Sequence, residues 1–366
     1  MKRFRRVTSI LISAALMLGC VGFSASAEQS NLTPAEQYAV YVDSLDWASY
    51  ETHDEMVEAA QIPVNLLNQM TTNDLVDALM NYPLLIDLNL FNTKREGFER
   101  VYQDFNGLRA LLEKDDGAMK LVERYENTSI ANGHMRSTNL ENAIIVPRFL
   151  ESLLAQNEII STLSETQESE LLKTVEEKCE QKSASPFYSG TINTFYETLA
   201  ENSGVTPLMD YTTIVLTPKQ TAVQVIWREY EFTSYEITEI NRQTEMAYPN
   251  ATRVKNASRR YNCHSYAWYS TSDYYIMDEP QQVKYMSDGS YVKTTVANGR
   301  KAYYYAGSHS AIVTTVRYDG TYRVTGKWGT ESGVYEHAPN YGPYDWHNPD
   351  HTGDPSILAI TFWRLA

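Results

Sequence analysis

The sequence is poor in cysteine, in basic residues and in long apolar runs. It holds three Cys in 366 residues, which excludes a small scaffold held together by many disulfides. Lys and Arg number 31 against 46 Asp and Glu, so the formal net charge is −15. This balance argues against nucleic acid as a partner, because phosphate contacts require clustered basic side chains. No stretch stays apolar for the roughly 20 residues that a transmembrane helix needs, so no transmembrane segment is predicted.

Apolar and aromatic residues are plentiful by contrast. The chain is 43% hydrophobic and 12% aromatic, which is typical of folded domains and excludes a disordered chain. Residues 1–27 have the order of a secretory signal peptide: a basic head, an apolar run over 10–23 and small residues before Ala27. We therefore expect a secreted or cell-surface protein. The sequence ending at Cys20 also resembles a lipoprotein signal, so a lipid anchor on Cys20 stays open.

The distribution of tyrosine divides the chain. Only six of the 27 Tyr precede Phe187, and Tyr favours the half-buried surface of a sheet. We predict an α+β protein with a helical domain over 28–185, a mixed connecting region over 186–255 and a strand-rich domain over 256–366. Residues 182–186 are small and polar and end in Pro, which predicts a linker.

Local signals support this division. Thr33 offers a hydroxyl cap, Pro34 takes the first helical position and Glu36 follows three residues after the cap, which predicts a helix start. A short helix is predicted from Cys263 to about residue 270. From His309 to Val316 the residues alternate with the period of two that a strand requires.

Cys263 is the candidate nucleophile. At the start of its predicted helix, the free N–H groups and the positive end of the helix dipole favour thiolate over thiol. His309 opens a strand 46 residues later and is predicted to act as the base, while the N–H of Cys263 binds the oxyanion. His264 is predicted to have only a surface or capping role. Cys179 lies on the apolar stripe of a predicted helix and is interpreted as a core residue, and a Cys179–Cys263 disulfide stays an alternative.

Three motifs carry a resemblance to a known family. They are Tyr-Asn-Cys-His-Ser-Tyr-Ala-Trp at 261–268, Gly-Ser-His-Ser-Ala-Ile-Val at 307–313 and Gly-Lys-Trp-Gly at 326–329. Together they resemble the papain-like cell-wall cysteine peptidases and amidases of bacteria, of the NlpC and CHAP types. The resemblance implies a Cys-bearing helix packed on an antiparallel sheet. It also implies that Cys263 is the nucleophile and His309 the base.

The residue that orients the histidine is less clear. In this family it is a polar residue on the strand after the histidine. A tight hairpin centred on Asp319-Gly320 would place position 309 opposite about 330, so Glu331 is the first candidate and His337 the second. Trp328 is interpreted as a structural aromatic residue.

These assignments predict a secreted cysteine peptidase or amidase. It would cut amide bonds of a cell-wall peptide or protein substrate through a thioester. The alternative is a non-catalytic surface protein whose helical domain binds a partner protein. The His- and Asp-rich segment 337–354 matches no metal motif and is interpreted as a polar loop, so no metal or cofactor is predicted.

Overall fold

In the computed structural model, mostly helical residues come first along the chain and mostly strand-forming residues follow, within one compact unit that spans residues 33–366. The predicted signal peptide, Cys20 and residues 345–354 lie outside the described residues. The structure describes residues 32–133, 135, 137–189, 193–204, 210–272, 274–304, 307–344 and 359–366. The domain boundaries expected near 185 and 255 lie inside the compact unit. Helices and antiparallel sheets make up the unit, which confirms the α+β class.

Helices form most of the first two thirds of the unit. They are α1 (Pro34–Asp43), η2 (Trp47–Ser49), α2 (His53–Ala59), α3 (Val64–Leu67), α4 (Thr72–Met80), η3 (Leu85–Asn89), α5 (Lys94–Asp104), α6 (Asn106–Leu112), α7 (Gly117–Glu126), α8 (Ser137–Leu154), α9 (Asn157–Ile160), α10 (Glu165–Ser183), α11 (Thr194–Asn202) and α12 (Ser234–Ala247). The predicted start of α1 is confirmed: the Thr33 side chain accepts the N–H of Glu36, and the Glu36 side chain accepts the N–H of Thr33. None of the helices in the described part has the length and apolarity needed to cross a bilayer.

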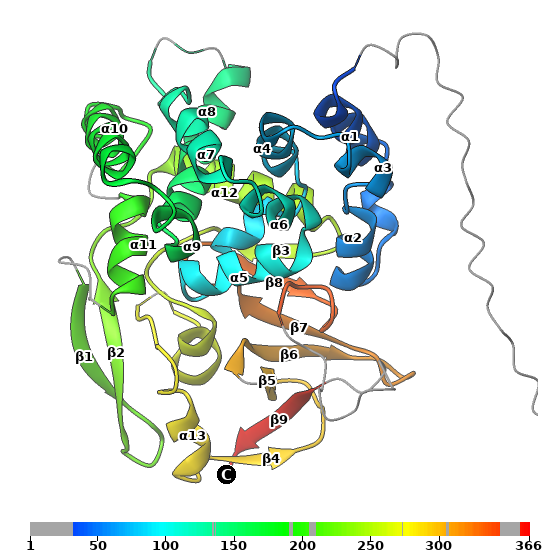
Figure 1. The fold of residues 1–366 in the computed structure, drawn as a ribbon. Helices are drawn as coiled ribbons and strands as arrows, with labels where there is room; N and C mark the ends of the chain where they lie inside the picture. Colours follow the sequence, from blue (N-terminus) through cyan, green and yellow to red (C-terminus); the bar gives the residue numbers. More distant parts are fainter. Residues whose placement is uncertain are drawn as a thin grey trace, which may run out of the picture. The chain divides into compact units, whose positions relative to one another are not determined.

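Two antiparallel sheets account for the described strands. A two-stranded sheet consists of β1 (Asp210–Leu216) and β2 (Ala222–Arg228). The second sheet contains β3 (Thr252–Lys255), β4 (Tyr291–Thr294), β5 (Lys301–Tyr304), β6 (Ser310–Val316), β7 (Tyr322–Lys327), β8 (Val334–His337) and β9 (Ile360–Leu365). Its order is β3-β8-β7-β6-β5-β9-β4. In Figure 1 the helices gather beside β3 and β8, and β9 and β4 lie at the opposite end. The short elements η4 (Ser265–Tyr269) and α13 (Val283–Ser287) precede β4.

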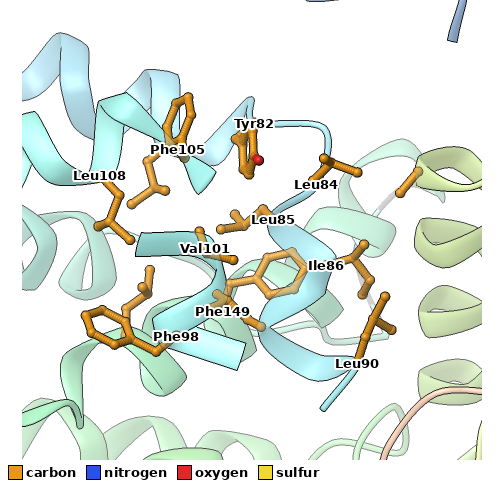
Figure 2. Packing of buried hydrophobic residues seen from close by; sticks show 14 of the residues in the cluster. Tyr82, Leu84, Leu85, Ile86, Leu90, Phe98, Val101, Phe105, Leu108 and Phe149 are labelled. Carbon is orange, nitrogen blue, oxygen red and sulfur yellow. The ribbon is translucent and has the colours of Figure 1, made fainter. Parts of the chain in front are cut away.

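One apolar cluster joins the helices to the larger sheet. In the helical part, the ring of Tyr82 stacks on that of Phe105 with the centroids 4.1 Å apart, and Figure 2 shows this packing together with Leu85 and Val101. The same cluster continues without a break to Trp328, which follows β7. The helical residues and the strands therefore share a core, which is why contacts do not divide them into separate domains.

The predicted linker at 182–186 is part of this packing. Lys182 is buried in α10 and its Nζ lies 2.6 Å from the carboxylate of Glu151. The Ser185 hydroxyl donates a hydrogen bond to the carbonyl of Ala131. The linker prediction is wrong because these small and polar residues have partners inside the fold rather than in solvent.

Candidate active site

Cys263 is the first residue of the predicted short helix. The Oδ1 of Asn262 accepts the N–H of Ser265 and that of Met277, both at 3.1 Å, and so fixes the start of the helical segment. The Cys263 residue is only 1% exposed. Its Sγ lies 3.6 Å from the Oδ1 of Asn92, a residue from the loop between η3 and α5.

His264 is held on both sides of its ring. Its Nδ1 lies 2.8 Å from the Ser310 Oγ, and its Nε2 lies 3.1 Å from the Glu279 Oε1. The Ser310 Oγ also accepts the indole N–H of Trp268 at 2.9 Å. The prediction of a surface or capping role is wrong: His264 is fully buried, with partners from other parts of the chain.

The charges around His264 favour its protonated form. Burial lowers the pKa of His264, but the negative charge and hydrogen bond of the Cys263 sulfur, together with Glu279, outweigh burial and raise it to about 10. The imidazole is therefore a cation at neutral pH. The Cys263 sulfur and the Glu279 carboxylate thus both favour the charged form of His264.

His309 lies in the same region and has different surroundings. Its ring stacks on Tyr344 with centroids 3.8 Å apart and meets the ring of Tyr304 edge-on. Both ring nitrogens are buried, and neither has a hydrogen-bond partner among the described residues. Burial, with the charges of His337 and His264, keeps the pKa of His309 well below its usual value, so the ring is neutral.

Gly326 lies beside the Nε2 of His309 and leaves no space there for the side chain of an orienting residue. A Cβ added to Gly326 would lie 2.6 Å from the His309 Nε2. This side of the ring therefore faces a glycine backbone instead of a polar side chain.

Glu331 has a different role from the predicted one. Its carboxylate forms ion pairs with Lys94, with Arg148 at 2.5 Å and with Arg259 at 3.4 Å. Burial raises the pKa of Glu331, but the three cations outweigh burial and hold it well below its usual value. Glu331 thus ties the helices to the sheet and does not contact His309.

The register of β6 and β7 explains this error. The turn spans more residues than a two-residue hairpin, since Val316 pairs with Tyr322. The register then shifts once more between Val313 and Thr315. Ile312 consequently faces Thr325, and the same register carried further puts position 309 opposite 328 instead of 330.

His337, the second candidate, lies near His309 with both its own nitrogens engaged. The ring centroids of the two histidines are 6.4 Å apart. The Trp328 indole N–H donates to the His337 Nε2 at 3.1 Å, and the Nδ1 lies 2.7 Å from the carbonyl oxygen of Ala338. Burial lowers the pKa of His337 to about 4. No described residue therefore orients His309 through a hydrogen bond.

The two cysteines are not joined. Cys179 and Cys263 are both free, which contradicts the disulfide alternative. Cys179 lies in α10 against Asn193, and burial raises the pKa of its thiol to about 11. This agrees with the interpretation of Cys179 as a packing residue.

Two cavities flank the Cys263–His264 pair. Glu279, which binds His264, lines a cavity of about 180 Å³ together with Phe91 and Ser308. Asn92, which contacts Cys263, lines another of about 240 Å³. Cys263 and His264 themselves line neither cavity, but each has one contact residue that does.

A separate cluster of metal-ligand types lies in the helical part. Atoms of His53, Asp87 and Asp104 come within 4.8 Å of one another. Arg100 already supplies a positive charge to this cluster, with its Nε 2.6 Å from Asp104 and its Nη2 3.0 Å from the His53 Nδ1. The guanidinium thus bonds two of the three members of the cluster.

No known family model, curated protein or solved structure matches this chain. The resemblance to papain-like cell-wall enzymes therefore stays a prediction from the three sequence motifs. The side-chain geometry adds three residues to the site that the sequence did not assign to it: His264, Glu279 and Asn92.

Proposed function

We propose that the protein is a secreted cysteine-dependent hydrolase of amide bonds, with a papain-like arrangement around Cys263. The observation that supports this most is a free, buried thiol directly before His264, a buried imidazole whose Nε2 lies 3.1 Å from the Glu279 carboxylate. The signal-like N-terminus and the three motifs favour peptides of the bacterial cell wall as substrates. Cys263 is the nucleophile, His264 the acid and base, and Glu279 the residue that orients His264.

The proposed reaction needs only Cys263, His264 and water. The Cys263 thiolate attacks the carbonyl carbon of the amide, and the carbonyl electrons move to oxygen. When the intermediate collapses, the His264 imidazolium gives up its hydrogen bond to the Ser310 Oγ and passes the Nδ1 proton to the leaving amine, and a thioester remains. Neutral His264 then removes a proton from water, the hydroxide attacks the thioester, and the thiolate leaves as the acid is released.

Cys263 itself is tested by hydrolysis of purified bacterial cell wall, followed through newly released amino groups. C263A is expected to abolish hydrolysis. The matched variant C179A should leave the rate unchanged, because that sulfur contacts no residue of the site. Full activity in C263A would refute the function.

The two histidines are tested by a second pair of variants. H264Q is expected to lower the rate by about 10²–10⁴-fold, which is the usual contribution of a general acid and base. H309Q should have the smaller effect, because the His309 ring lacks hydrogen-bond partners among the described residues. A larger loss of rate in H309Q than in H264Q would assign the acid–base role to His309, as the motif predicts.

A non-catalytic surface role is the competing proposal. It is favoured by the 1% exposure of Cys263 and by His309, whose ring nitrogens bond to none of the residues that the structure describes. Alkylation of the native protein by iodoacetamide separates the two proposals. Rapid labelling of Cys263 at pH 7 supports the enzyme, and labelling that requires unfolding supports the surface role.

A further inference from the structure

The helical part sends one loop to the nucleophile. Asn92 lies 171 positions from Cys263 in the sequence, and its side-chain Oδ1 is 3.6 Å from the Cys263 Sγ. The loop joins η3 to α5 and so belongs to the helical part, outside the segment that carries the family motifs. This contact therefore bears on what the helical part contributes to the site.

The loop is fixed by hydrogen bonds from residues after β7. The Leu90 carbonyl accepts the Tyr344 hydroxyl at 2.7 Å, and the Phe91 carbonyl accepts the Thr330 N–H at 3.1 Å. The Asn92 carbonyl accepts the Thr330 hydroxyl at 3.4 Å. Three successive carbonyls are thus bound by the strand-rich part.

A close backbone approach adds to this attachment. Gly329 has a φ of +58°, which favours glycine, and a Cβ there would overlap the carbonyl oxygen of Phe91. Two residues beyond Asn92, Lys94 pairs with the buried Glu331. The chain around Asn92 is held on both sides, so its amide has a defined place beside the sulfur.

We infer that Asn92 is a catalytic residue of this site and that its side-chain amide binds the oxyanion formed during attack by Cys263. This inference rests on the proposed function. It also assigns a role to the helical part, which completes the active site instead of acting as a separate binding domain.

The chemistry of an amide suits this position. In the structure the Cys263 thiol donates to the Oδ1 of Asn92. Once the sulfur has lost its proton, a half-turn of the amide removes this oxygen and presents the two N–H donors to the same place. The oxyanion forms on the carbon that is bonded to sulfur, so a group that touches the sulfur lies within reach of it. An amide is uncharged, so it stabilises the oxyanion without forming an ion pair with the attacking sulfur. Asn92 also lines the cavity of about 240 Å³, from which a substrate can reach it.

The test compares two reactions of Cys263 in the full-length protein. Amide hydrolysis passes through an oxyanion, whereas alkylation by iodoacetamide does not. N92A is expected to lower kcat for hydrolysis by about 10²–10³-fold, as for other oxyanion donors. Alkylation of Cys263 should stay within about threefold of the wild-type rate or become faster, because the thiol is no longer covered. N92D, of the same shape, should lose at least as much hydrolysis because a carboxylate repels the oxyanion.

The outcomes separate this inference from the proposed function. Loss of hydrolysis in N92A or N92D with alkylation retained supports the role of Asn92. An increase in both hydrolysis and alkylation overturns it and identifies the loop as an inhibitory cover. Wild-type hydrolysis in both Asn92 variants, with C263A inactive, overturns the inference alone, whereas activity in C263A overturns the proposed function. If N92A does not fold, as judged by circular dichroism, the isosteric N92D alone decides between these outcomes.

Discussion

Acid should destabilise this protein through His337. This ring accepts the Trp328 indole N–H on its Nε2 and uses its Nδ1 on the carbonyl of Ala338. A second proton would sit on Nε2 and point at the Trp328 N–H, so two hydrogen-bond donors would face each other in a buried place. This agrees with a pKa of His337 that burial lowers to about 4. In the unfolded chain the group has its ordinary pKa, close to 6.5.

The sign and size of the effect follow from these two values. Between pH 6.5 and 4 the unfolded chain binds the proton that the folded protein refuses, so stability falls as the pH falls. A difference of about 2.5 pKa units corresponds to about 3 kcal/mol of unfolding free energy lost by pH 4. His309, also buried and neutral, acts in the same direction.

Two carboxyl groups act in the opposite direction. Burial raises the pKa of Asp87 and that of Glu201 to about 7, so folding favours their protonated forms and stability falls as the pH rises from 4 to 7. The total pH dependence thus mixes opposing contributions. The contribution of His337 is obtained from the difference between the wild type and H337Q, because the carboxyl groups are common to both.

The assay is urea unfolding of both proteins at pH 7, 5.5 and 4. H337Q should be the less stable protein at pH 7, because it loses packing and hydrogen bonds. The loss of stability from pH 7 to pH 4 should be smaller in H337Q than in the wild type by about 3 kcal/mol. Parallel pH profiles, with the same difference at every pH, would refute the argument that His337 is held neutral.

Three further predictions concern the ties between the two parts and the second cysteine. E331Q removes the charge that three buried cations share, and should destabilise the protein by about 3–5 kcal/mol in urea unfolding; an unchanged midpoint would show that the cations are neutralised elsewhere. G329A forces a side chain into a positive φ and against Phe91, so it should lower the melting temperature and also slow hydrolysis by Cys263; a variant that is fully active and stable contradicts the close approach. Cys179 should label slowly with iodoacetamide at pH 7 because burial raises its pKa to about 11, and mass spectrometry that finds rapid labelling would disprove its placement.

Much of the local structure follows from neighbouring residues. The helix that begins after Thr33 and the strand that alternates from position 310 are set by signals within a few residues, and both form as expected. The start of the helix at Cys263 is local in the same way. The linker at 182–186 looks solvent-exposed in sequence, but the partners of Lys182 and Ser185 come from residues that no local pattern identifies.

The site shows where such reasoning ends. The error at Glu331 comes from the longer turn after Val316 and from a register shift between Val313 and Thr315, neither of which the alternation of residue types reveals. The position of His264 directly after Cys263 predicts only a surface or capping role, whereas Ser310 and Glu279 from other parts of the chain hold its ring. Asn92 carries no motif, and its contact with the sulfur depends on how the whole chain folds.

The bonds to Leu90, Phe91 and Asn92 set an order of events during synthesis. Asn92 leaves the ribosome early, but Tyr344, which binds the Leu90 carbonyl, is made more than 250 residues later. A nascent chain that ends before Tyr344 therefore carries both Cys263 and Asn92 but lacks one of the bonds that fix the loop beside the sulfur. Reactivity of this centre is then a property that only the finished polypeptide acquires.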